Sequence, residues 1–234
     1  MDKQTKTQLL NIVKKNYLEI ADHYSETRKR FPSPLWDALF EIIKEVKDGD
    51  KILDVGCGSG RLLDFFGEQK IDYLGIDSSE RMIDNAKKLH PNFDFVLGDV
   101  LELSLLPKIN FDWVFSVAVF HHIPGEDLRV IALKQLKNKI SDSGKIVIAV
   151  WNMWSQKRFR RLILKFCVLK LLKKNNYDCG DILFDWKDEK GEIASQRYYH
   201  AFTKRELTKL ARKADLKIEK IFKDSHNYYL VLKK

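Results

Sequence analysis

The stretch at residues 53–61, which reads LDVGCGSGR, is the feature that most constrains the fold of this chain. It follows an apolar β-type run and precedes a second apolar run whose spacing favours a helix. Gly56, Gly58 and Gly60 permit a sharp turn and leave a space beside the backbone that a Cβ would fill. The stretch therefore predicts a strand, a tight turn and a helix, with a nucleotide-type ligand at the turn.

The spacing of the glycines argues against a dinucleotide ligand. The fingerprint G-x-G-x-x-G requires a third glycine at the position that Arg61 occupies. Asp54 lies two residues before the first glycine, where its carboxylate would repel a pyrophosphate and attract an ammonium group. S-adenosylmethionine (SAM) carries such an ammonium group and no phosphates. We therefore expect SAM in this loop.

Two further acidic residues follow the next strand-like runs. Asp77 lies about 20 residues beyond the loop, where doubly wound folds place an acid that binds the ribose hydroxyls. Asp99 ends the following run and can accept the adenine amino group. Because ligands of open α/β sheets bind at the carboxyl ends of the strands, these acids are expected to meet. The predicted cofactor contacts are Tyr17, Asp54, Gly56, Gly58, Gly60, Asp77, Ser78, Asp99, Val100 and Val117.

The order of the predicted elements indicates the fold. Apolar residues at helical spacing predict a first helix, and Ser33 before Pro34 predicts the start of a second. Strands then alternate with helices up to residues 144–151, and runs at 216–222 and 228–232 form a terminal hairpin. We expect a Rossmann-like α/β sheet of seven strands with helices on both faces. The whole chain, residues 1–234, is expected to be one domain: N-terminal helices at 1–49, a cofactor-binding core at 50–151, an insertion or lid at 152–196, and a helix and hairpin at 197–234.

The predicted insertion is strongly basic. The chain has a net charge of +9, and residues 156–176 contain eight basic residues and no acidic one. As a helix, this segment can meet a nucleic acid, lie on a membrane surface or cover the domain. Its apolar residues predict one broad apolar face, formed by Phe159, Leu162, Ile163, Phe166, Val168, Leu169 and Leu172.

Cysteine usage and hydropathy bear on the compartment. Cys57, Cys167 and Cys179 show no disulfide or zinc-binding spacing, so we expect no disulfide, no metal and a reducing environment. No apolar run approaches the roughly 18 residues of a membrane span, and the first residues lack the apolar core of a signal peptide. The sequence therefore predicts a cytoplasmic protein.

The glycine loop, Asp77 and Asp99 resemble the motifs of class I, seven-stranded SAM-dependent methyltransferases. Three stretches narrow the resemblance: IADHYSETR at residues 20–28, SVAVFHHI at 116–123 and RYYHAFTKREL at 197–207. Together they resemble the tRNA wobble-uridine carboxymethyl methyltransferases, which esterify 5-carboxymethyluridine in the anticodon. The resemblance implies the anticodon stem-loop of tRNA as partner. As in eukaryotic members of that family, it also implies a small zinc-binding activator protein.

The resemblance also implies the candidate catalytic residues. A carboxylate acceptor is ionised at neutral pH, so it requires positioning and exclusion of water rather than a strong base. Hydrogen-bond donors would hold the carboxylate, and aromatic rings, among them Tyr199 and Trp151, would stack on the extruded base. The candidates are Arg28, His121, His122, Arg197, Tyr198 and His200.

Several alternatives stay open at this point. Arg28 can pair with the SAM carboxylate instead, one of the two histidines can be a packing residue, and Tyr198 can belong to the core. The segments at 29–32 and 184–186 depart from the family pattern, so a carboxymethoxyuridine acceptor also fits. An O-methyltransferase for a small molecule or a lipid is the alternative enzyme. A non-catalytic SAM-binding module is disfavoured because every predicted cofactor position is intact.

Overall fold

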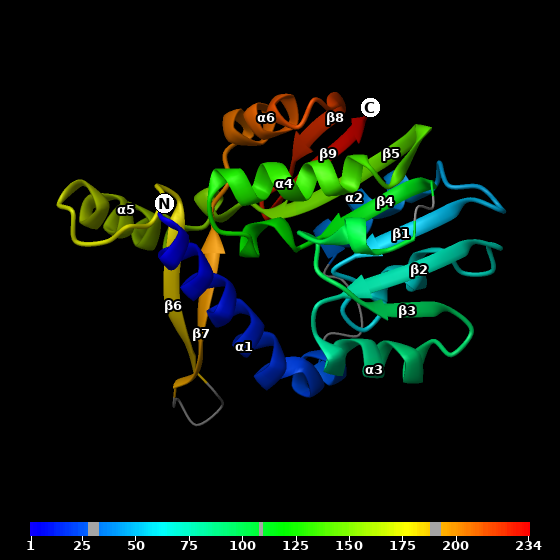
Figure 1. Cartoon of the computed structure of the whole chain (residues 1–234), viewed down its shortest axis with the longest axis horizontal. Helices are drawn as coiled ribbons and strands as arrows, with labels where there is room; N and C mark the ends of the chain where they lie inside the picture. Colours follow the sequence, from blue (N-terminus) through cyan, green and yellow to red (C-terminus); the bar gives the residue numbers. More distant parts are fainter. Residues whose placement is uncertain (28–32, 108–109, 188–192) are drawn as a thin grey trace.

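The computed structural model describes residues 1–27, 33–107, 110–187 and 193–234 (Figure 1). In this part of the chain, seven strands form one sheet in the order β3-β2-β1-β4-β5-β9-β8. The first five are parallel, and β9 runs antiparallel to both β5 and β8. The predicted seven-stranded sheet with its terminal hairpin is confirmed. The strands are β1 (Lys51–Val55), β2 (Asp72–Asp77), β3 (Asp94–Leu97), β4 (Phe111–Val117), β5 (Ile140–Trp151), β8 (Lys217–Lys223) and β9 (Asn227–Lys233).

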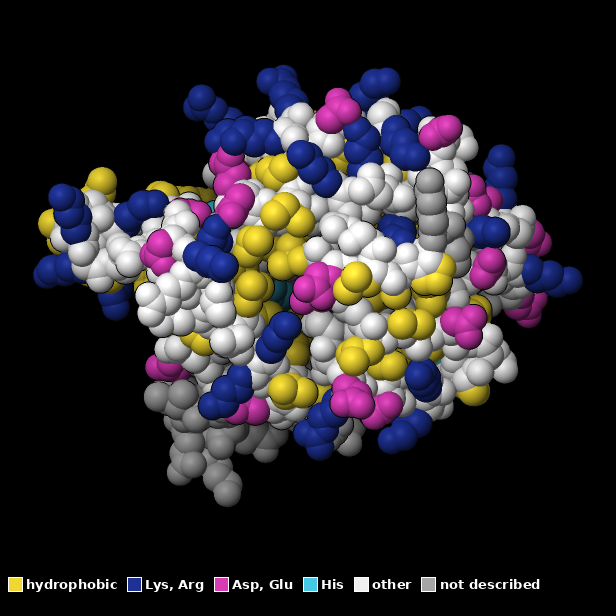
Figure 2. All heavy atoms as spheres, in the orientation of Figure 1, with side chains coloured by type: hydrophobic (Ala, Val, Ile, Leu, Met, Phe, Trp, Pro, Cys, Tyr) yellow, Lys and Arg dark blue, Asp and Glu magenta, His cyan; other side chains and the backbone are white. Residues whose placement is uncertain are grey.

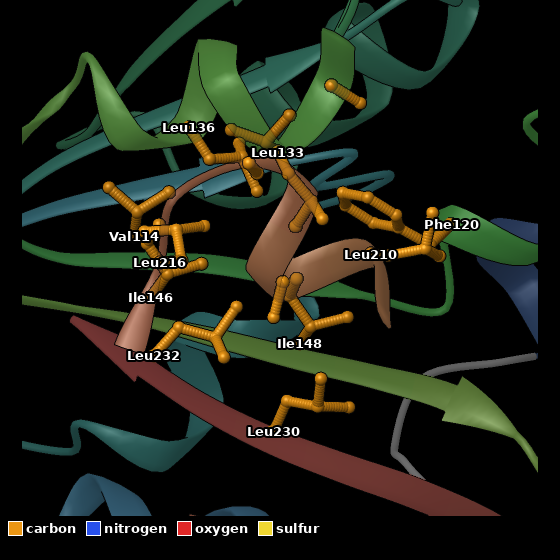
Figure 3. Packing of buried hydrophobic residues seen from close by; sticks show 14 of the residues in the cluster. Val114, Phe120, Leu133, Leu136, Ile146, Ile148, Leu210, Leu216, Leu230 and Leu232 are labelled. Atoms are coloured by element: carbon orange, nitrogen blue, oxygen red, sulfur yellow. The ribbon is translucent and has the colours of Figure 1, made fainter. Parts of the chain in front are cut away.

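Helices cover both faces of this sheet. On one face, α4 (Glu126–Lys137) and α6 (Lys204–Lys213) bury leucines against Val114 and Ile146 (Figure 3). On the other face, α2 (Ser33–Ile43) and α3 (Glu80–Leu89) pack on Phe115. Successive residues of β4 thus enter opposite cores, which explains why parallel strands buried on both faces are continuously apolar. The first helix, α1 (Lys3–Thr27), crosses the sheet edge and contacts α3.

The glycine loop leads into a shorter helix than expected. Residues Arg61–Phe65 form a 3₁₀ turn, η1, rather than an α-helix. Gly60 begins it with φ 84°, and Gly67 follows it with φ 54°. Because the turn is tight, consecutive apolar residues such as Leu62 and Leu63 are both buried.

The expected insertion folds into a projecting arm, which we define as α5 (Lys157–Leu171), β6 (Asp181–Lys187) and β7 (Ile193–His200) (Figure 1). The predicted basic helix is confirmed as α5. The two strands pair antiparallel in a separate sheet that the sequence did not predict, and RYYH lies in β7. The apolar face of α5 is buried in part. Phe159 and Ile163 are buried against this sheet, whereas Val168 and Leu172 are more than half exposed because the sheet does not extend beneath them.

A disulfide joins Cys167 of α5 to Cys179, which corrects the expectation that no disulfide forms. Helix α5 and the chain returning towards β6 bring the two cysteines together, although their spacing resembles no known framework. Cys57 is buried and free.

We expect the double change Cys167→Ser and Cys179→Ser to weaken the arm and leave the main sheet intact. Closing a loop of this length contributes on the order of 3 kcal/mol in the chain-entropy account. Hydrogen exchange should accelerate in α5 and β6 and stay unchanged in β4. Unchanged exchange in α5 would contradict a structural contribution of the disulfide.

Helix α6 begins after Thr203, whose hydroxyl accepts a hydrogen bond from the Glu206 backbone N–H, as the capping-box pair of Thr203 and Glu206 in the sequence predicts. The Glu206 carboxylate is directed elsewhere, to His200 and Arg129. In the described part of the chain, no helix is long and apolar enough to cross a bilayer.

Candidate active site

A cavity opens at the carboxyl ends of the central strands, beneath α1. It encloses about 870 Å³, counting the open solvent at its mouth. The structure brings the predicted cofactor residues together here, with the exception of Gly60. Those that line it are Tyr17, Asp54, Gly56, Gly58, Asp77, Ser78, Asp99, Val100 and Val117.

Some residues that line the cavity were not predicted from the sequence. Val13 lies one helical turn before Tyr17, so the i, i+4 spacing on α1 contains a signal for it. Met82 comes from the first turn of α3, and no sequence motif marks it. Gly60 lies outside the lining because its backbone faces His90 and Phe95, where a Cβ would approach the His90 ring to 2.8 Å.

Gly56 is the glycine of the loop that packs most closely against a neighbouring side chain. A Cβ at this position would lie 2.2 Å from Cγ2 of Val119, which also lines the cavity. The residue has φ 79°, a conformation that side chains disfavour. Glycine is therefore required here because the loop backbone packs directly against Val119. A Cβ at Gly58, which also lines the cavity, would meet no atom within 4 Å, so the open space beside the loop lies at that position.

Asp54 is a buried carboxylate at one side of the cavity. One of its oxygens accepts a hydrogen bond of 2.9 Å from the Tyr73 hydroxyl. Burial raises the pKa of Asp54 to about 7, although the Tyr73 hydrogen bond opposes the rise. A buried carboxylate with this environment is stabilised by a cation, so the site fits the expected ammonium group.

Asp77 and Asp99 lie at the ends of β2 and β3. The Asp77 carboxylate accepts hydrogen bonds of 2.9 Å from the N–H groups of Gly58 and Ser79, and burial nevertheless raises its pKa. Asp99 accepts a hydrogen bond from the Leu101 N–H, and its other oxygen lies 3.7 Å from Nζ of Lys14 on α1. The oxygens of both carboxylates can accept further hydrogen bonds, so Asp77 can bind ribose hydroxyls and Asp99 can bind an amino group.

His122 lies at the mouth of the same cavity, in a turn after β4 named η3 (Phe120–His122). Its Nδ1 is 3.3 Å from the Tyr198 carbonyl oxygen, and its Nε2 is 2.8 Å from the Tyr17 hydroxyl. A carbonyl only accepts, so Nδ1 carries the proton and Nε2 accepts from Tyr17. Burial lowers the pKa of His122 to about 4, and the charge of Arg197 contributes. The ring is therefore neutral near pH 7.

His121 belongs to an aromatic cluster beside the cavity. Its ring lies 5.2 Å from those of both Trp151 and Tyr199, and burial holds its pKa well below the usual value. The Tyr199 ring stacks on Trp151 and on Phe184, at 5.1 and 5.5 Å. Trp151 and Phe184 are partly exposed, so they are the members of the cluster that a planar ligand can reach.

The remaining predicted catalytic residues are divided between two faces of β7. Successive side chains of a strand point in opposite directions, so Arg197 and Tyr199 face one way and Tyr198 and His200 the other. Neither Tyr198 nor His200 is among the described residues that line the cavity, and both contact Asp181, at 2.8 and 2.6 Å. Arg28 lies outside the described residues.

Comparisons with known proteins agree with this geometry. Residues 52–144 match a family model described as a methyltransferase domain. A tRNA (carboxymethyluridine(34)-5-O)-methyltransferase from Schizosaccharomyces pombe is 28% identical over 229 residues, which cover 93% of this chain and 94% of that protein. A protein of the same name from Saccharomyces cerevisiae is 32% identical over 141 residues, which cover 59% of this chain and 47% of that protein.

The fold also matches solved structures. A crystal structure of a SAM-dependent methyltransferase from Methanosarcina mazei superposes with a TM-score of 0.68 at 20% identity. The match covers 83% of this chain and 96% of the other. At this level of identity the match concerns the fold alone.

Proposed function

We propose that this chain, which is a class I SAM-dependent methyltransferase, esterifies the carboxylate of a carboxymethylated uridine at the wobble position of tRNA. SAM is its cofactor. The observation that carries the proposal is the similarity to the fission yeast tRNA methyltransferase over almost the whole of both chains. A related carboxylated uridine, such as carboxymethoxyuridine, fits the same chemistry.

The residues around the cavity suit the cofactor. When bound, SAM supplies an electrophilic methyl group on a positively charged sulfur. Asp54 would hold the ammonium group, Asp77 the ribose and Asp99 the adenine amino group, while Gly58 leaves open space beside the loop backbone. Tyr17 and Val13 of α1 cover the cavity and limit access of water.

The state of His122 supports an acceptor that is already ionised. With a pKa of about 4 and its Nε2 accepting from Tyr17, this ring is a weak base at neutral pH. A hydroxyl acceptor needs a base to remove its proton, whereas a carboxylate does not. The proposed role of His122 is to hold the Tyr17 hydroxyl at the mouth of the cavity, where the acceptor approaches.

The arm supplies the proposed contact with RNA. All eight basic residues at 157–174 are exposed, and Figure 2 shows Lys and Arg side chains gathered on the projecting α5. Lys170 forms an ion pair with Asp178 at 3.5 Å. Exposed cations on one projecting helix can bind the phosphates of an anticodon stem. The partly exposed rings of Trp151 and Phe184 are the proposed stacking surface for the extruded base.

The proposal is tested by transfer of labelled methyl from SAM to tRNA, with a zinc-binding activator protein supplied in a parallel reaction. We expect label on tRNA that mild alkali removes, because esters hydrolyse and N-methyl groups do not. Nucleoside mass analysis should place it on a wobble carboxymethyl- or carboxymethoxyuridine. Label on no tRNA in either reaction would favour a small-molecule or lipid acceptor.

Neutralising the arm should weaken RNA binding selectively. We expect Arg160→Gln, Arg161→Gln and Lys165→Gln together to weaken tRNA affinity about tenfold and to reduce the salt dependence by about two counterions. Affinity for SAM should not change. The matched control neutralises three exposed cations of α6, namely Lys204, Arg205 and Arg212. Equal losses in both variants would contradict a specific contact at α5.

We further propose that residues 1–234 act as a single methyltransferase domain in which the arm serves as the substrate-binding insertion. We also propose that the protein works in the cytoplasm and that a small zinc-binding activator protein can act with it.

A further inference from the structure

Arg129 of α4 is the largest fully buried side chain in the described part of the chain, with 1% of its surface exposed. Burial of a charged group is unfavourable unless partners satisfy it. Here every nitrogen of the guanidinium has a partner. Nε donates to the Ile123 carbonyl at 2.9 Å, Nη1 to Glu206 at 3.2 Å, and Nη2 contacts Asp181 and the Tyr198 hydroxyl at 3.4 and 3.3 Å.

These partners come from four different parts of the fold. Ile123 follows η3, Asp181 begins β6, Tyr198 lies in β7 and Glu206 lies in α6. The nitrogens of a guanidinium are held in one plane, so a single side chain fixes the directions of all these contacts at once. Lysine has one nitrogen and cannot reproduce this geometry.

Two of the contacts bear on His122. The Ile123 carbonyl ends the turn that carries His122, so Nε of Arg129 fixes the position of that turn. The Tyr198 hydroxyl is held between Arg129 and Asp181, and the Tyr198 carbonyl accepts the hydrogen bond from His122 Nδ1. The histidine and its hydrogen-bond acceptor are thus held by one guanidinium.

We propose that Arg129 is a positioning residue for methyl transfer, which orients His122 and selects its Nδ1–H tautomer by joining η3 to β7. Nε2 of His122 is then left to accept from the Tyr17 hydroxyl of α1 at the mouth of the cavity. The expected effect of Arg129 on turnover rests on the proposed function, whereas its effect on the His122 tautomer rests only on these contacts.

His200 and Glu206 complete the cluster around Arg129. His200 lies between the carboxylates of Asp181 and Glu206, with its two nitrogens at 2.6 and 2.8 Å from them. Glu206 therefore connects the cluster to α6, away from His122. This arrangement provides a control, because Glu206→Gln perturbs the same cluster and retains an oxygen that accepts from Arg129.

The test compares Arg129→Lys, Tyr198→Phe and Glu206→Gln. Arg129→Lys keeps the positive charge and loses the planar set of N–H donors. Tyr198→Phe removes one hydroxyl group and is the milder change. We expect kcat for tRNA methylation to fall at least tenfold in Arg129→Lys and severalfold in Tyr198→Phe. The Kd of SAM should stay within twofold of the wild-type value, and Glu206→Gln should keep the wild-type kcat.

The tautomer of His122 is read directly by ¹⁵N NMR of histidine-labelled protein, with the signal assigned by its loss in His122→Asn. We expect a pure Nδ1–H tautomer in the wild type and in Glu206→Gln, and a mixture in Arg129→Lys and Tyr198→Phe. An unchanged His122 signal in both variants would overturn the proposal, as would a kcat in Glu206→Gln reduced as far as in Arg129→Lys. If wild-type protein methylates no tRNA, the proposed acceptor is wrong, and the NMR comparison still decides the role of Arg129.

Discussion

Asp54→Asn is expected to lower the affinity for SAM at least a hundredfold and, in the absence of SAM, to stabilise the folded protein above pH 7. Burial removes water from this carboxylate and raises its pKa to about 7, although the hydrogen bond from the Tyr73 hydroxyl opposes the rise. The amide keeps that hydrogen bond and carries no charge. It therefore avoids the desolvation of an ion and cannot attract an ammonium group.

The pH dependence of this effect has a definite sign. The folded protein holds a proton on Asp54 up to a pKa of about 7, whereas the unfolded chain releases it near the ordinary aspartate pKa of 3.8. The contribution of Asp54 to stability is thus fully present below about pH 4 and is lost as the pH rises to 7. The full shift of the Asp54 pKa corresponds to about 4 kcal/mol of folding stability. We expect Asp54→Asn to regain about 2 kcal/mol of this stability at pH 8, since the buried amide is itself desolvated.

Urea unfolding at pH 4.5 and pH 8 measures the stability, and calorimetry measures SAM binding. Binding of the ammonium group favours the ionised carboxylate, so wild-type affinity should fall about tenfold per pH unit below pH 7, and Asp54→Asn should lack this dependence. The matched control is Asp72→Asn, because Asp72 is an exposed carboxylate at the start of β2, the strand that carries Tyr73. Equal stability of Asp54→Asn and wild type at pH 8, together with unchanged SAM affinity, would refute the assigned role.

Gly56→Ala is expected to lose both SAM binding and stability. The new Cβ would lie 2.2 Å from Val119 Cγ2, so Val119, which lines the cavity, must move. A left-handed backbone at alanine adds about 1 to 2 kcal/mol. We expect the free energy of unfolding to fall by about 3 kcal/mol and SAM affinity to fall at least a hundredfold.

Two further variants separate the causes of this loss. Gly49→Ala has a similar φ, 87°, but no atom lies within 4 Å of its Cβ, so it reports the backbone strain alone. Val119→Ala in the Gly56→Ala background removes the clash and should restore part of the SAM affinity. If the double variant binds SAM no better than Gly56→Ala, the contact with Val119 is not the cause. Isothermal titration and urea unfolding supply both quantities.

Part of the candidate site was predictable because its signals are local. The glycine loop, Asp77 and Asp99 each lie at the end of a short apolar run, and parallel strands bring their carboxyl ends to one edge. The side chains of RYYH alternate between the two faces of β7. The sequence did not predict this alternation because it did not predict an antiparallel hairpin at this position.

Hydrophobic periodicity and turn residues, which act over a few neighbouring positions, predicted the seven strands, the terminal hairpin and the edge of the sheet at which the cofactor cavity forms. The order of the strands in the sheet did not follow from these local signals. Only the tertiary structure decided the pairing of Cys167 with Cys179, the arm sheet and the cluster around Arg129. Arg129 is separated by 52 residues from Asp181 and by 77 from Glu206. Contacts over such distances leave no periodic pattern in the chain. They form only when packed elements exclude water from the charges and leave each buried polar group to find its partner within the protein.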